Sequence, residues 1–207
     1  MIGAHTFVER YTPPHTRRAH PPCTYLSSSI KFGNKVDMYL EQFVDQGWLD
    51  LSYACDPLFE ELIASGDKAA TAAHDIRNEL LRAGFVATES QVPALAFGMC
   101  PILDLIGYNR VGECVIVELK CGRSALDRST NSGTMRSPFN TLKHNGYTKA
   151  MLQLAIQRTC LSSMRNVAPH AWLVTHAHST TTSHIAIKNL PCAISELVES
   201  HLVCFNK

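Results

Sequence analysis

The stretch CPILDLIGYNRVGECVIVELKCG, residues 100–122, constrains this chain more than any other. It contains two aliphatic and β-branched runs separated by the polar, glycine-containing segment 109–113, which predicts two antiparallel strands joined by a short loop. Yet the first run contains Asp104, and the second contains Glu118 and Lys120. Burying charges costs several kcal/mol unless they are paired or bind a metal. The three charged residues therefore predict a functional site.

The register of this predicted hairpin would bring the charges together. Successive side chains point to opposite faces of a strand, so Glu118 and Lys120 share one face. If the loop is centred on Val111, Asp104 lies directly opposite Glu118. Opposed like charges destabilise a sheet, and a hard cation resolves the conflict, since Mg²⁺ prefers one or two carboxylates together with phosphate and water. The alternative is an exposed hairpin in which Glu118 and Lys120 form a weak surface pair.

These residues resemble the signature of the PD-(D/E)xK nuclease superfamily, in which an acid opens the second core strand and (D/E)-x-K closes the third. The matching segments are PILD, ending in Asp104, and VELK, containing Glu118 and Lys120; Leu103 stands where the signature has proline. The resemblance implies that Asp104, Glu118 and the backbone carbonyl of Leu119 hold Mg²⁺ or Mn²⁺. It gives Lys120 the catalytic role of orienting or activating water.

Two further segments resemble the RecB and λ-exonuclease-like branch of this superfamily. FGNKVDMYLEQF resembles its helix pattern G-x-x-V-(H/E), which makes Asp37 a further metal ligand, although His or Glu is usual there. YTKAMLQLAIQ resembles its Q-x-x-x-Y element, which makes Gln153 a catalytic residue and leaves Gln157 where tyrosine is usual. Glu79, at the border of an apolar helix face, is the alternative to Asp37 as the helix-borne ligand.

Hydrophobic periodicity and turn signals predict the remaining elements. The predicted helices cover residues 31–44, 57–64, 67–83, 147–161 and 193–203. The predicted strands cover residues 85–92, 102–107, 114–120, 171–175 and 184–187. With the resemblance, this order implies an α/β (α+β) fold with a restriction-endonuclease-like core, αβββαβ, in which helices flank a mixed central sheet and a helical insertion precedes the first strand.

Two segments lack such periodicity. Residues 1–29 are rich in Pro, His, Ser and Thr, and we expect them to form an extended or disordered arm, which leaves residues 30–207 as one nuclease-like domain. Residues 122–146 are polar and rich in Ser, Thr and Gly. A loop of this length within a compact domain is usually functional or mobile, so we expect a lid or a nucleic-acid clamp there.

The net charge of +1 conceals an uneven distribution. Residues 37–118 carry 4 basic and 14 acidic side chains, whereas residues 119–170 carry 8 and 1. Binding of a polyanion needs such clustering even when the net charge is near zero, so the basic segment predicts a track for the phosphates of a nucleic acid. A solvated loop and helix face is the alternative. The predicted contacts are Arg123, Arg128, Arg136, Lys143 and Lys149.

Composition suits a single globular domain: 207 residues, of which 45% are hydrophobic, can build one core. No apolar run approaches the roughly 18 residues of a membrane span. The eight cysteines show no C-x-x-C spacing, and Cys100, Cys114 and Cys121 lie in or beside apolar strand sequence. We expect these cysteines to be reduced and the protein to lie in an intracellular, reducing compartment.

Three functions remain in competition. The first is a Mg²⁺-dependent or Mn²⁺-dependent nuclease, either an exonuclease or a structure-dependent endonuclease, that hydrolyses phosphodiester bonds. Its expected substrate and partner is DNA, and a protein partner in recombination or repair is a further hypothesis. The second is an inactive nuclease-fold protein that binds nucleic acid or serves assembly; the intact set of two acids and a lysine argues against it. The third is a zinc-dependent hydrolase that uses His176, His178 and His184, but no further ligand follows at a recognisable spacing.

Overall fold

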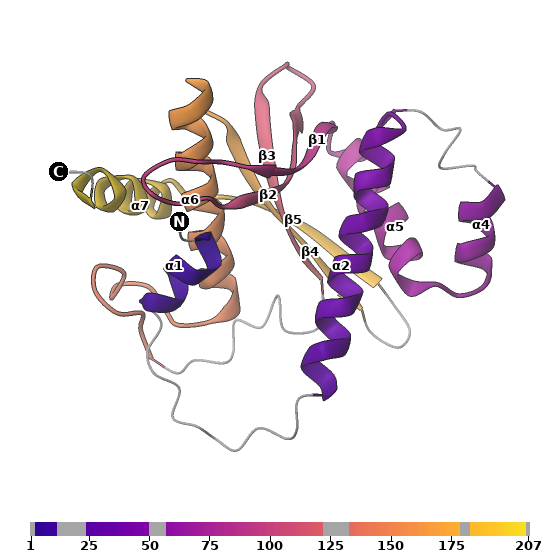
Figure 1. Ribbon diagram of the computed structural model, residues 1–207, viewed down its shortest axis with the longest axis horizontal. Coiled ribbons are helices and arrows are strands. Elements are labelled where there is room, and N and C mark those ends of the chain that lie inside the picture. The colour runs from indigo at the N-terminus through magenta and orange to yellow at the C-terminus, as the bar shows by residue number, and fades with distance from the viewer. Residues whose placement is uncertain (1–2, 12–23, 50–56, 122–132, 179–182, 206–207) are drawn as a thin grey trace.

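The computed structural model describes residues 3–11, 24–49, 57–121, 133–178 and 183–205 (Figure 1). Its helices are α1 (Ala4–Arg10), α2 (Thr24–Asp45), α4 (Pro57–Ala64), α5 (Lys68–Arg82), α6 (Gly146–Arg165) and α7 (Cys192–Phe205). Its strands are β1 (Val86–Pro93), β2 (Ile102–Tyr108), β3 (Cys114–Cys121), β4 (His170–His178) and β5 (Ser183–Asn189). All the helices and strands predicted between residues 31 and 203 are therefore present. Within the described ranges, no helix has the length and apolar character needed to cross a membrane.

The strands form one five-stranded sheet in the order β1-β2-β3-β4-β5. Pairing is antiparallel except between β3 and β4, which are parallel because α6 connects them as a crossover. The result is a mixed α+β fold with a mixed sheet flanked by helices, as in a restriction-endonuclease-like core, and the predicted fold class is confirmed.

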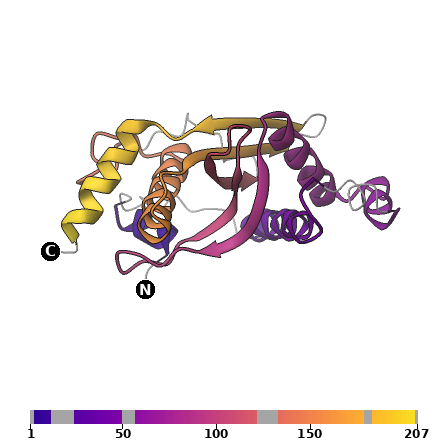
Figure 2. The same ribbon diagram turned by 90° about the horizontal axis from the view of Figure 1, so that it is seen from above.

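The helices lie on both faces of the sheet, as the view from above shows (Figure 2). On one face, α2 and α5 bury residues such as Leu40, Ile76 and Leu80 together with side chains of β2, β3 and β4. On the other face, α6 packs with α1 and α7. Residues on β3 alternate between these two cores: Val115 and Val117 belong to the first, and Ile116 belongs to the second. Alternation therefore places Glu118 on the α6 face.

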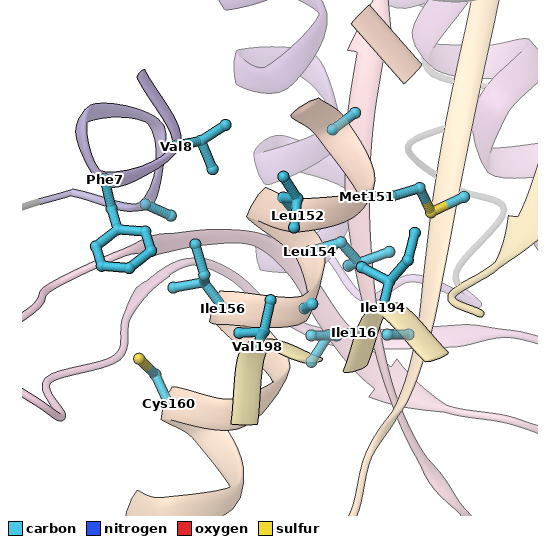
Figure 3. Packing of buried hydrophobic residues seen from close by; sticks show 14 of the residues in the cluster. Phe7, Val8, Ile116, Met151, Leu152, Leu154, Ile156, Cys160, Ile194 and Val198 are labelled. Carbon is cyan, nitrogen blue, oxygen red and sulfur yellow. The ribbon is translucent and has the colours of Figure 1, made fainter. Parts of the chain in front are cut away.

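The expected N-terminal arm is wrong for residues 4–10, which form α1. Phe7 and Val8 are buried against the α6 side of the sheet (Figure 3). An ion pair between Glu9 and Lys149 of α6, with an N–O distance of 2.9 Å, joins the two helices. The helix is too short for its periodicity to show in the sequence, and tertiary packing is what stabilises it. Residues 12–23 lie outside the described part of the chain, and α2 begins at Thr24, before the predicted helix start.

The expected polar loop over residues 122–146 needs a similar correction. Residues 122–132 lie outside the described part, but the segment 133–145 packs onto the core. Met135 and Phe139 are 2% and 1% exposed and join the same apolar cluster as α6. Two isolated apolar side chains among polar neighbours give no periodic signal, although their burial is enough to anchor the segment. Residues 133–145 are therefore anchored to the core, and a lid or clamp formed by this loop stays a prediction.

Candidate active site

The predicted register of the hairpin is confirmed. β2 and β3 pair as Tyr108 with Cys114 and Leu105 with Val117, which centres the loop on Val111. The same register places Asp104 next in line opposite Glu118. The paired residues end at Leu105, and a side-chain hydrogen bond then joins the two strands: Asp104 Oδ2 accepts the backbone N–H of Leu119 at 2.7 Å.

Glu118 lies in the interior because β3 is a central strand with a neighbour on each side. Its side chain is 1% exposed, so its charge needs partners within the protein. Lys120 Nζ donates to Oε1 of Glu118, and Gln157 Nε2, on α6, donates to Oε2 at 2.6 Å. Both carboxylate oxygens are thus engaged, which explains how a buried strand tolerates the acid.

Lys120 is the partner of Glu118 that retains contact with solvent. Its side chain is 33% exposed. Burial alone would lower its pKa, but the negative charges of Glu118 and Asp104 outweigh burial, and the pKa of Lys120 is raised above its ordinary value. The raised pKa favours the ammonium form of this side chain.

The carboxyl groups at the site repel one another. Burial, followed by the charge of Glu118, raises the pKa of Asp104 well above its ordinary range, and Lys120 compensates only in part. Burial and then Glu118 raise the pKa of Asp37, on α2, to about 6. Two neighbouring carboxyl groups on adjacent strands are a suitable donor set for a hard divalent cation.

The two candidates for a helix-borne ligand differ in surroundings. Asp37 lies close enough for its charge to raise the pKa of Asp104. Glu79 instead pairs with Arg82 at 2.8 Å and lines a polar cleft with residues of α5 and β5, which favours Asp37. Across the described ranges no three His, Cys, Asp or Glu side chains are grouped to hold a metal. The strand carboxylates are thus the acidic pair that the geometry offers, and ligation by Asp37 stays a prediction.

On α6, the structure brings Gln157 to the site. Gln157 is 1% exposed and contacts Glu118 directly, whereas Gln153, one turn earlier, is half-buried. The side chain of Gln153 forms no hydrogen bond with the described part of the chain, and its predicted catalytic role stays a prediction. The sequence analysis noted Gln157 only as a departure from the resembled pattern; its polar side chain amid the apolar residues of α6 was the available signal.

The predicted nucleic-acid contacts have varied surroundings. Arg123 and Arg128 lie outside the described residues. Arg136 and Lys143 are exposed on the segment that leads into α6, whereas Lys149 is paired with Glu9. Farther along the same basic segment, Arg158 pairs with Glu199 and Arg165 pairs with Glu89. These ion pairs join α6 to α7 and to β1.

The histidine alternative finds no support in the described residues. His176 is 2% exposed on β4, whereas His184 on β5 is exposed and pairs in register with Ala177. Residues in register share a face and successive residues alternate, so His176 and His184 lie on opposite faces of the sheet. The side chain of His178 lies outside the described part.

Comparisons with known proteins find similarity to solved structures at low sequence identity. No family model and no curated protein matches the chain. A crystal structure named "putative exonuclease", from Eubacterium rectale, superposes with a TM-score of 0.49 at 15% identity, over 86% of this chain and 66% of that one. This chain thus spans less than two thirds of that protein's length. The protein SSO0001 superposes with a TM-score of 0.34 at 16% identity, over 86% of each chain. At these values, function has to be inferred from the site itself.

Proposed function

We propose that this protein is a metal-dependent nuclease that hydrolyses phosphodiester bonds of DNA. The observation that carries the proposal is that Asp104 and Glu118, on adjacent strands, lie close enough for the charge of Glu118 to raise the pKa of Asp104, beside the ammonium of Lys120. A purely structural role would not require two buried carboxyl groups whose negative charges repel each other. Replacement of a buried charged cluster by apolar residues is often neutral or stabilising, so the cost of this cluster argues for a function.

Each residue has a separate task in the proposed reaction. Asp104 and Glu118 would hold Mg²⁺ or Mn²⁺, which when bound supplies electrostatic stabilisation of the phosphate and activation of water. The backbone carbonyl of Leu119, between Glu118 and Lys120, is the proposed additional ligand. Lys120 would orient the attacking water and offset the negative charge that develops on the phosphate. Asp37 would act beside this pair as a further ligand or as a nearby negative charge.

Lys120 also serves as the counter-charge of Glu118. Its Nζ donates to Oε1 of that buried carboxylate. The same oxygen would be the one that Glu118 offers to a divalent cation, and Lys120 would then act on water and phosphate.

The test is cleavage of labelled DNA by the purified protein with Mg²⁺ or Mn²⁺, with EDTA as the control. Linear duplex, nicked duplex, single-stranded DNA and RNA distinguish the substrate classes. Asp104→Asn should abolish cleavage while DNA binding persists. The variant should also raise the melting temperature in EDTA, because it relieves repulsion with Glu118 and its amide oxygen can still accept the Leu119 N–H. Full activity of Asp104→Asn would remove this site from consideration.

A further inference from the structure

Gln157 is the buried polar side chain of α6 that joins the two site strands. Its Nε2 donates to the backbone carbonyl oxygen of Ile102 on β2 at 2.8 Å. The same nitrogen donates to Oε2 of Glu118 on β3 at 2.6 Å. A primary amide nitrogen carries two N–H donors, so both are used, one for each strand.

The two acceptors belong to the strands that carry the site acids. Ile102 lies on β2 two residues before Asp104, and Glu118 lies on β3 one residue beyond Val117, which pairs with Leu105. Because Gln157 is 1% exposed, water does not compete for these hydrogen bonds, and their geometry is held by the packing of α6. A tyrosine, usual at this position in the pattern the sequence resembles, has a single O–H donor and could not satisfy both acceptors.

We call the two hydrogen bonds of Gln157 Nε2, to Ile102 and to Glu118, the Gln157 fork. Because the fork holds one oxygen of Glu118, the other oxygen is the one that can change its partner. Oε2 is held from the helix side by Gln157, and Oε1 faces Lys120. A metal-binding carboxylate is usually oriented by such an outer hydrogen bond, and loss of that bond costs affinity for the metal. Gln157 itself need not touch the cation or the substrate to have this effect.

We propose that Gln157 is a positioning residue that fixes the Glu118 carboxylate so that Oε1 is presented to the divalent cation. The inference rests on the proposed nuclease function and deepens it. A residue of α6 would thus strengthen metal binding without contacting the metal, through its hydrogen bond to Glu118. A merely structural Gln157 would stabilise the fold without changing the affinity for the metal.

The test compares Gln157→Met with Thr159→Val. Methionine keeps the length of glutamine but cannot donate to Glu118. Thr159 is a matched control, because it is buried on the same helix and its hydroxyl donates to the Ala155 carbonyl oxygen within that helix, at 2.9 Å. Mn²⁺ binding is measured by electron paramagnetic resonance without DNA, and cleavage is then titrated against Mn²⁺.

We expect Gln157→Met to weaken Mn²⁺ binding by about 10- to 100-fold, and Thr159→Val to change it less than about twofold. The cleavage rate of Gln157→Met should be low at limiting Mn²⁺ and recover toward wild type as Mn²⁺ saturates. A structural role would instead lower the rate equally at all Mn²⁺ concentrations. If Gln157→Met does not fold, Gln157→Asn, whose amide is one methylene too short for the fork, is measured with the same expectations.

The outcomes separate the inference from the function on which it rests. If wild type binds Mn²⁺ and cleaves DNA, and the folded Gln157 variant binds Mn²⁺ as tightly as wild type, the positioning role is wrong and the nuclease function stands. If wild type neither binds Mn²⁺ nor cleaves any of the four substrates, both the function and the positioning role are overturned.

Discussion

At the scale of single residues, the proposed role of Lys120 gives the most direct test. Its ammonium pairs with Glu118 and still reaches solvent. We expect Lys120→Met to keep affinity for DNA and Mn²⁺ and to lose turnover by about two to four orders of magnitude, the usual contribution of a positioned acid–base group. Lys120→Arg should recover only part of the rate, because arginine keeps the charge but does not deprotonate. Single-turnover cleavage at saturating Mg²⁺ measures both.

A wild-type rate for Lys120→Met would contradict the catalytic role and leave Lys120 as a counter-charge for Glu118. The counter-charge role predicts a separate effect, on thermal stability. Removing the ammonium leaves Glu118 buried with one hydrogen-bond donor fewer, so Lys120→Met should melt at a lower temperature than wild type in EDTA. Saturating Mn²⁺ should reduce that difference, because the cation then supplies the missing positive charge.

Asp37 gives a pH dependence whose sign is fixed. Its pKa is about 6 in the folded protein against an ordinary value of 3.8, so the folded state binds the proton more tightly. Stability from this group is present at low pH and is lost as pH rises through about 6. In EDTA, Asp37→Asn should therefore flatten the fall in unfolding free energy between about pH 4 and pH 7, by at most about 3 kcal/mol. Urea denaturation across this range measures it; curves of equal slope for wild type and variant would refute the shift.

At the scale of elements, the hairpin could be predicted because its information is local. The loop residues fix the centre of the turn, and alternation then fixes which side chains lie on the same face. The proximity of Asp104 and Glu118 could therefore be predicted from the sequence. The contacts of Gln157 could not be predicted in this way, since its partners lie 39 and 55 positions away in the chain and no periodicity encodes such a contact. The α1 helix was missed for the same reason: its stability comes from α6 and α7.

The packing of α1 is therefore a prediction in its own right. Phe7 is 5% exposed and contacts the rings of Tyr11 and His201, at centroid distances of 5.2 and 6.0 Å. We expect Phe7→Ala to lower the free energy of unfolding by about 3 kcal/mol, typical of a buried phenylalanine. Thr6→Ala, on the exposed side of the same helix, should change it by less than about 0.5 kcal/mol. Urea denaturation decides; equal stability of the two variants would mean that α1 is not docked in solution.

At the scale of the whole molecule, two pairs of basic residues lie in different surroundings. Arg82 and Arg165 each pair with an acid. Arg82 also lies beside the β2–β3 loop, because its carbonyl oxygen accepts from Arg110 at 2.9 Å, and this loop is at the opposite end of β3 from Lys120. Arg136 and Lys143 are exposed on the segment leading into α6, the helix that contacts Glu118. If DNA approaches the site, only the second pair should meet phosphate.

Neutralising Arg136 and Lys143 together should therefore weaken DNA binding equally for unrelated sequences, because phosphate contacts carry no base information. The slope of log K against log salt should become shallower by up to about two, roughly one for each lost contact. Arg82→Gln with Arg165→Gln removes the same net charge and should leave the slope unchanged, which separates local contact from overall charge. Fluorescence anisotropy across a salt series measures both. Equal slopes for the two double variants would place the DNA path elsewhere on the protein.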